Sequence, residues 1–429
     1  MTERHSPQFP FPPGYPRSPE NSPPEFLPLA TTPTPFPVPV ASHQVFWLGV
    51  NGQKYTCQLL DSKLNVSSVV RVNKSKSRTV SLVCTEDYVV ALCGLALVVE
   101  NPSTGREMRK ILGVPPDERP LSHVMGALVN GKTLFICAGY RVFMQDLSSD
   151  FLICEKSLKQ YLPPGTYPSF STLLLCNNSM VFGLPMTCVC FLRGGDRRRL
   201  WERFLCTEFR PQPSFPEAGD IPTFAALSDE EIMVCCGGHA YRISMENGEN
   251  ISEPLVLARG WRGPILTLYD KNLDKGHAFV LVQDTLWAIS VFESFKEDNR
   301  QRVFSSSAGS QQISMAWDPE LKLIFVAGHG QVVCLNMALE IKWQEHYTPE
   351  DKSALVLCFD QQLQLLVLSI ASKVFMFNPR NGASVHKIRL PVLEKHSYCT
   401  TLCTQESSYD MNASGFLHNN YIAALMERQ

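Results

Sequence analysis

Short apolar runs alternate with turn residues along most of the chain, and the clearest example spans residues 312–347. Its four runs, ISMAW, LKLIFVA, QVVCLN and IKWQE, are separated by DPE, GHG and MALE. Apolar runs of this length between turn residues are typical of β-strands. The unit therefore predicts a four-stranded antiparallel meander, and residues 354–390 repeat the same plan.

Seven copies of this unit follow one another. They begin near residues 79, 123, 172, 220, 265, 312 and 354, so that successive starts lie 42 to 49 residues apart. A period of this size is typical of the blades of a β-propeller. Glycine often stands between the third and fourth runs, as at Gly105, Gly248 and Gly382, because such turns require positive φ. The predicted blades span residues near 79–122, 123–171, 172–219, 220–264, 265–311, 312–353 and 354–397.

The two ends of the repeat region contain incomplete copies. Three strand-like runs, VFWLGV, QKYTCQLL and VSSVVRV, precede residue 79, with an Asn51-Gly52 hairpin turn after the first and polar DSKLN before the third. The run YCTTLCT follows the seventh copy. Residues 43–78 and 398–404 are therefore predicted to form one composite blade, which closes the ring and removes exposed strand edges. Eight blades are preferred on this basis, with seven blades as the alternative.

Segments of different composition flank the predicted propeller. Proline supplies 13 of the first 40 residues, so residues 1–42 are predicted to be a disordered tail with polyproline-II character. Within the tail, Pro12, Pro13 and Tyr15 form a P-P-x-Y pattern that resembles ligands of WW domains, although a merely solvated tail fits as well. Residues 405–429 form the C-terminal tail, in which YIAALMERQ predicts a short amphipathic helix.

Charge and hydropathy narrow the compartment and the class of partner. The 39 basic and 41 acidic residues give a net charge of −2, so no global field attracts nucleic acid or an anionic membrane. The first residues lack a secretory pattern, and the apolar run Tyr88 to Val99 is too short to span a bilayer. Most of the 15 cysteines lie in strand-like runs, as reduced buried cysteines do. We expect a cytoplasmic or nuclear protein without a membrane segment.

The blade units resemble those of the WD40 and quinoprotein-type propellers over about residues 45–404. Residues 313–336 are similar to the first three strands of a WD40 repeat, although the closing Trp-Asp pair and the regular Gly-His opening of that family are absent. The runs that end at Trp201 and Trp343 resemble the quinoprotein blade ending, in which a turn leads to a tryptophan docked between blades. The resemblance implies one all-β propeller of four-stranded antiparallel blades, residues 43–429, and carries no function with it.

Two groups of residues have side chains suited to cofactor or metal chemistry. The adjacent Cys235 and Cys236 resemble the vicinal pair of quinoprotein dehydrogenases, but neighbouring residues on a strand point to opposite faces, so one cysteine packing inward and one outward is the simpler prediction. His396, Cys399 and Cys403, with Cys188 and Cys190, provide at best half of a structural zinc pattern. No catalytic motif accompanies them. We therefore predict no catalytic residue, no cofactor and no metal.

An arginine-rich segment, RGGDRRRLWERF, is the sharpest candidate for partner binding. Arginine next to aromatic residues is the composition enriched at binding hot spots. The competing interpretation is a solvated turn followed by the buried residues of a fourth strand. The predicted protein-binding residues are Arg193, Arg197, Arg198, Arg199, Trp201 and Arg203.

The sequence favours a non-enzymatic interaction scaffold or adaptor subunit of an intracellular complex. Rigid blades present loops on two faces and grooves between them, which suits protein partners. A WW-domain protein is a second partner that the tail would bind. The alternatives are a cofactor-binding propeller enzyme that uses the central channel, and a nucleic-acid-associated propeller that uses the arginines; nucleic acid is not the expected partner.

Overall fold

The computed structural model describes residues 44–404 with gaps. The longest gaps cover residues 73–80, 112–123, 162–171, 206–220, 305–312 and 390–398, and residues 1–43 and 405–429 also lie outside the described part. Contacts divide the chain into two units, Met1–Ser42 and His43–Gln429. The predictions for both tails, including the WW-ligand-like Pro12, Pro13 and Tyr15, lie outside the described residues.

The described strands form eight four-stranded sheets, which are called blades 1 to 7 and the composite blade. The composite blade contains β1 (Gln44–Val50), β2 (Gln53–Leu60), β3 (Lys63–Arg71) and β32 (Cys399–Thr404). Blade 1 contains β4 (Ser81–Cys84), β5 (Val89–Cys93), β6 (Ala96–Asn101) and β7 (Arg106–Ile111). Blade 2 contains β8 (Val124–Asn130), β9 (Thr133–Ala138), β10 (Arg141–Asp146) and β11 (Leu152–Ser157). Blade 3 contains β12 (Thr172–Cys176), β13 (Ser179–Leu184), β14 (Thr187–Leu192) and β15 (Arg199–Phe204).

The remaining four blades follow in chain order. Blade 4 contains β16 (Thr223–Ala226), β17 (Glu231–Cys236), β18 (His239–Ser244) and β19 (Leu255–Val256). Blade 5 contains β20 (Ile265–Leu268), β21 (His277–Val282), β22 (Thr285–Ser290) and β23 (Lys296–Arg302). Blade 6 contains β24 (Ile313–Asp318), β25 (Leu323–Gly328), β26 (Gln331–Asn336) and β27 (Ile341–His346). Blade 7 contains β28 (Leu355–Asp360), β29 (Leu365–Ile370), β30 (Lys373–Phe377) and β31 (Ser384–Arg389).

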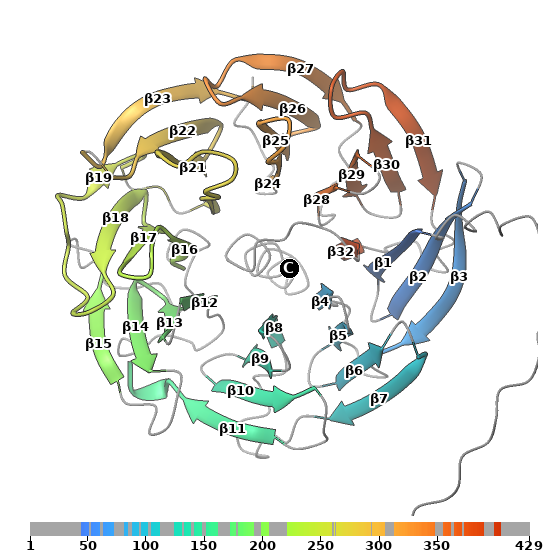
Figure 1. Ribbon diagram of the computed structural model, residues 1–429, viewed down its shortest axis with the longest axis horizontal. Coiled ribbons are helices and arrows are strands. Elements are labelled where there is room, and N and C mark those ends of the chain that lie inside the picture. The colour runs from blue at the N-terminus through green and yellow to red at the C-terminus, as the bar shows by residue number, and fades with distance from the viewer. Residues whose placement is uncertain are drawn as a thin grey trace, which may run out of the picture. The chain divides into compact units, whose positions relative to one another are not determined.

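Within each of blades 1 to 7, neighbouring strands in sequence are neighbours in the sheet and run antiparallel. The first strand of each blade lies toward a common centre and the fourth strand lies outermost (Figure 1). The helical element among the described residues is the 3₁₀ turn η2 (Lys159–Tyr161). No helix in the described part of the chain has the length and apolar character needed to cross a membrane.

Buried apolar side chains join the blades to one another. Because most second and third strands bury residues on both faces, each face packs against a different neighbour. One cluster joins blades 3 and 4 through Trp201 and Phe224, and another joins blades 6 and 7 through Phe325 and Phe359, whose rings stack. Similar clusters join the other consecutive blades, and β28 contacts β32. The all-β propeller with four-stranded antiparallel blades that the sequence predicts is therefore confirmed.

The composite blade brings the two ends of the repeat region together. β32 pairs with β1, with Phe46 opposite Thr404, and the sheet continues through β2 and β3. The sequence predicts that polar DSKLN, residues 61–65, separates two strands. In the structure β3 begins inside this segment, at Lys63, and pairs along all of β2. A register shift between Thr56 and Cys57 accommodates the extra residue. Polar residues in an outer strand cost little because one face is open to water.

A bulge recurs between the third and fourth strands. The register shifts by one residue at Met144/Gln145, Cys190/Phe191, Ala288/Ile289, Cys334/Leu335 and Met376/Phe377. A bulge bends the strand and redirects the side chains beside it. Trp201 and Trp343 each pair with the cysteine on one side of this shift. The bulge therefore sets the direction of the fourth-strand side chain that meets the next blade.

Candidate functional site

The arginine-rich segment is divided between described and undescribed residues. Arg193, Arg197 and Arg198 lie outside the described part, whereas Arg199, Trp201 and Arg203 lie on β15, the outer strand of blade 3. The structure therefore places three of the six predicted residues on one strand of six residues. Their individual environments differ.

Trp201 is part of the contact between blades 3 and 4. Its ring is buried, and its indole N–H donates a hydrogen bond of 2.8 Å to the carbonyl oxygen of Met245. The ring lies so close to Gly248, where φ is +75°, that a Cβ atom there would be 2.6 Å from it. Trp343 repeats this arrangement with Pro379, at 2.7 Å, and Gly382. Both tryptophans dock between blades, as the quinoprotein resemblance implies.

Arg203 and Arg199 have opposite surroundings. Arg203 donates from Nη1 to the carbonyl oxygen of Gly248 at 2.5 Å, so it adds to the contact between blades 3 and 4. Arg199 has a side chain that is 50% exposed; it pairs with Glu202 at 2.8 Å, and its guanidinium lies 5.5 Å from the centre of the Tyr161 ring. Arg199 is thus the described arginine of this segment that a partner can reach.

The vicinal cysteines are separated by the sheet of blade 4. Cys235 belongs to the apolar cluster between blades 4 and 5, and Cys236 belongs to the cluster between blades 3 and 4. Both side chains are buried, and burial raises the pKa of Cys235 well above its usual range. The prediction that the two side chains point to opposite faces is confirmed.

The residues considered for a metal are distributed over two regions. Cys188 and Cys190 are buried in the cluster between blades 3 and 4, where burial raises the pKa of Cys190 to about 12. His396 lies outside the described residues, and Cys399 and Cys403 lie on β32. Among the residues whose side chains the structure describes, no group of three or more His, Cys, Asp or Glu residues is placed to hold a metal ion.

His329 occupies the turn between β25 and β26, where its φ of 50° is in the left-handed region. Its ring lies 5.0 Å from the ring of Phe304, and its Nδ1 atom is buried without a hydrogen-bond partner in the described structure. Burial lowers the pKa of His329, and the carboxylate of Asp284 opposes that shift. The folded protein therefore favours the neutral imidazole.

Replacing His329 by asparagine should weaken the loss of stability on acidification. In the wild type, the unfolded chain binds a proton at His329 more readily than the folded chain does, so the free energy of unfolding falls as the pH drops through the range near 6.5. Asparagine tolerates the left-handed turn and does not titrate. Urea unfolding between about pH 5 and pH 8 measures the difference in slope; equal slopes would contradict this role.

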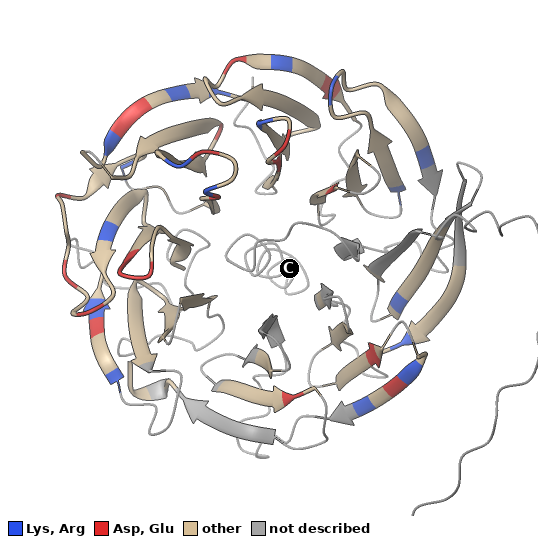
Figure 2. Cartoon of the chain, in the orientation of Figure 1, with Lys and Arg blue, Asp and Glu red and all other residues tan. Residues whose placement is uncertain are grey.

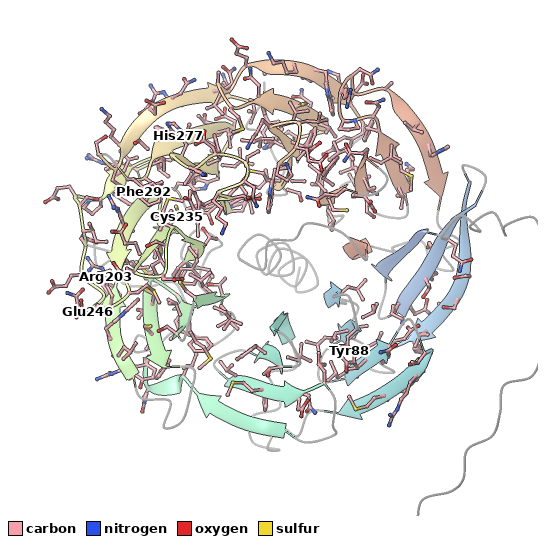
Figure 3. All side chains as sticks on the ribbon, in the orientation of Figure 1. Tyr88, Arg203, Cys235, Glu246, His277 and Phe292 are labelled. Atoms are coloured by element: carbon pink, nitrogen blue, oxygen red, sulfur yellow. The ribbon has the colours of Figure 1, made fainter. Side chains whose placement is uncertain are left out.

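The outer edge of blade 4 departs from the repeat. Its fourth strand, β19, has two residues, whereas β23 has seven and β27 and β31 have six. Ile251, Val256 and Phe292 are 42%, 44% and 43% exposed, and Ile251 and Val256 lie in the chain segment that runs along β18. Figure 3 shows Glu246 at the outer rim of the ring and Phe292 farther in, between blades 4 and 5. The sequence did not predict this surface. The one signal in the sequence is that the fourth apolar run of blade 4, PLVLA, contains no charged residue.

Comparisons with solved structures identify the fold. Sqt1 from Saccharomyces cerevisiae matches with a TM-score of 0.55 and 13% identity, over 73% of this chain and 87% of its own. BamB from Moraxella catarrhalis matches with a TM-score of 0.53 and 11% identity, over 80% and 92%. A chain of the mitotic checkpoint complex matches with a TM-score of 0.50 and 11% identity, over 67% and 83%. No protein-family model and no curated protein sequence matches this chain.

The blades and these likenesses together define the class. The chain is a β-propeller built from four-stranded antiparallel blades. At identities of 13% and below, the likenesses show the fold and leave the function to be argued from the surface of this chain.

Proposed function

We propose that this protein is a non-enzymatic interaction scaffold or adaptor subunit of an intracellular complex. The observation that carries the proposal is the outer surface, where the outermost strands carry charges of both signs (Figure 2) and cover buried apolar strands. Every residue of β23 but one is exposed, and the neighbouring β22 is buried along its centre. A rigid scaffold that displays varied side chains suits partner recognition.

The number of blades belongs to the same proposal. Eight four-stranded sheets, with β32 between β1 and β28, support an eight-bladed ring that both ends of the repeat region close. Side-chain packing is described most fully for six of them, blades 1 and 3 to 7. The inner edges of a closed ring are short and protected, so its outer strands and turns are the surfaces that partners meet.

Likenesses to other proteins support a role in assemblies at the level of the fold. One neighbour is a chain of a complex, the mitotic checkpoint complex. We propose the cytoplasm or nucleus as the compartment, protein as the partner, and the tail with Pro12, Pro13 and Tyr15 as a second contact for a WW-domain protein. Neither the scaffold role nor the tail contact requires a cofactor.

The arginine segment gives the first experimental test. Affinity purification of the full chain should recover specific partners, and replacing Arg197, Arg198 and Arg199 together by alanine should reduce one of them about tenfold, since arginine is enriched at hot spots. Arg300 provides a matched control, because it also pairs with an acidic residue three positions away and lies 5.1 Å from an aromatic ring centre, that of Trp287. Arg300→Ala should not reduce recovery of the partner that the triple variant loses.

Two outcomes separate the parts of this proposal. If the triple variant retains all partners at wild-type level, the arginine segment is not a binding site, and the scaffold function still stands. A full chain that recovers no specific partner, with or without residues 1–42, would remove the scaffold itself.

A further inference from the structure

The bulge in the fourth strand fixes one position from which a side chain reaches the next blade. The residue that follows the extra residue of the bulge is Trp201 in blade 3 and Trp343 in blade 6. In the composite blade the same register shift, between Thr56 and Cys57, brings Ser68 to this position. The composite blade therefore has a serine where blades 3 and 6 have a docked tryptophan.

Ser68 lies on the face of the composite blade that is directed toward blade 1. On this face Lys54 lies opposite Val70, and its ammonium group pairs with the carboxylate of Glu100 on β6. Val70 packs against the apolar cluster that contains the core residues of blade 1. Ser68 is two residues from Val70 on the same strand, with no register shift between them, so both side chains share this face.

The corresponding turn of blade 1 resembles a turn that receives a tryptophan. Residues 101–105 read NPSTG, and residues 378–382, which receive Trp343, read NPRNG. Gly105 and Gly382 have φ values of +65° and +71°. Each glycine donates its N–H to the carbonyl oxygen of the asparagine four positions earlier, at 2.8 and 2.9 Å. The turn of blade 1 therefore has the conformation against which a tryptophan ring docks in blade 7.

The site in blade 1 is open, whereas the two equivalent sites are filled. A Cβ atom at Gly248 or Gly382 would lie 2.6 Å from a tryptophan ring. At Gly105 no atom of the residues that the structure describes lies within 4 Å of this point. Gly248 and Gly382 are buried, but Gly105 and Ser68 are both exposed to solvent. The boundary between the composite blade and blade 1 therefore has room for a ring.

The six tryptophans of the chain have other positions. Five of them lie in or between blades 3 to 6. The sixth, Trp47, lies on the second strand of the composite blade opposite Thr56, which is the register position of Phe325 in blade 6. Neither terminal tail contains a tryptophan. An indole ring that docks at Gly105 therefore comes from another polypeptide.

We infer that the open site between the composite blade and blade 1 binds a tryptophan side chain of a partner protein. The two filled sites define the chemistry. In each, the ring lies against the glycine, and the indole N–H donates to a backbone carbonyl oxygen of the turn, at 2.8 Å for Trp201 and 2.7 Å for Trp343. Phenylalanine has no such donor, and tryptophan is enriched at binding hot spots. This inference rests on the scaffold function proposed above and names one of its surfaces.

The test uses a phage-displayed library of random peptides, selected on the full chain. We expect tryptophan to be enriched in the recovered peptides. Gly105→Ala places a methyl group where the ring would lie, so this variant should bind the peptides about tenfold more weakly than the wild type. Gly237→Ala is the matched control, because Gly237 also has a positive φ, +57°, and no described atom near its Cβ position, but lies in blade 4. The control should bind like the wild type.

A second variant, Ser68→Trp, supplies the ring from this chain. It should raise the midpoint of thermal unfolding by about 2 °C or more, because a docked ring adds buried contacts, and it should block peptide binding. Adding Gly105→Ala to this variant should remove the rise, beyond the loss that Gly105→Ala causes alone. Val385→Trp, at an exposed position of β31, is the control and should leave the midpoint and peptide binding unchanged.

Three results overturn the inference. The first is a set of recovered peptides without enriched tryptophan, and the second is equal peptide binding by the Gly105→Ala and Gly237→Ala variants. The third comes from sedimentation of the full chain: a dimer that Gly105→Ala alone dissociates would show that a second copy, and not a partner protein, occupies the site. If any of these occurs while affinity purification of the wild type still recovers specific partners, the scaffold function stands without this site.

Discussion

Replacing Trp343 by alanine is expected to lower the free energy of unfolding by about 3 to 5 kcal/mol, the usual cost of truncating a buried aromatic side chain. The loss has two parts. The ring lies against Gly382 and 6.0 Å from the ring of Phe325, so its removal opens a cavity between blades 6 and 7. The buried carbonyl oxygen of Pro379 also loses the indole N–H that donates to it at 2.7 Å.

Urea unfolding of the purified chain measures this effect, and two further variants interpret it. Lys342→Ala, on the same strand and partly exposed, should change the free energy of unfolding by less than about 0.5 kcal/mol. Trp343→Asn should be almost as unstable as the alanine variant. Asparagine stands at the equivalent place in blade 5, where Asn299 donates to the carbonyl oxygen of Ala338, but it leaves the cavity open. Wild-type stability in Trp343→Ala would show that the blades hold together without the ring.

Replacing Gly382 by alanine should be more harmful than the same change at Gly105. Both residues have positive φ, +71° and +65°, and both donate a backbone hydrogen bond to an asparagine four positions earlier. The Cβ of an alanine at Gly105 meets no atom within 4 Å. The free energy of unfolding therefore falls only by the strain of the left-handed backbone, about 1 to 2 kcal/mol. At Gly382 the new Cβ would also lie 2.6 Å from the Trp343 ring, which adds about 1 to 3 kcal/mol of overpacking.

Comparison of the glycine variants separates the effect of the tryptophan contact from the effect of the turn conformation. Gly248→Ala should behave like Gly382→Ala, because its Cβ would lie 2.6 Å from Trp201. Equal losses of stability in all three variants would mean that the turn conformation alone accounts for the need for glycine. Differential scanning calorimetry under identical buffer conditions gives the ranking directly.

Most of the blade pattern was predictable because strand burial imposes a simple rule. Second and third strands such as LIFVAG and QVVCLN are buried on both faces, so they read as continuous apolar runs between turn residues. Glycines at Gly105, Gly248 and Gly382 marked the following turns. Leu339 shows the limit of that signal, since it has a φ of 59° in the corresponding turn of blade 6 without being glycine.

The surface was less predictable, because it depends on which neighbour each outer-strand residue meets. Trp201 and Arg199 are two residues apart in an arginine-rich run, yet one is buried against the next blade and the other is exposed. The bulge in β15 decides this, and no residue type encodes it. The sequence did not predict that β19 is shorter than the other outer strands, because a strand of two residues has no periodic pattern. The contact between Arg242 and Phe292 forms only when blades 4 and 5 pack together, so neither residue signals it alone.

The composite blade can form only near the end of translation, because its strands come from both ends of the repeat region. β1 leaves the ribosome early, but its partner β32 is made only when residues 399–404 appear. Until then the nascent chain carries an unsatisfied strand edge on β1, and such edges attract other chains. A premature stop codon anywhere before residue 399 should therefore produce an aggregation-prone polypeptide rather than a shorter ring, and chaperones that shield β-edges during translation should be important for its yield.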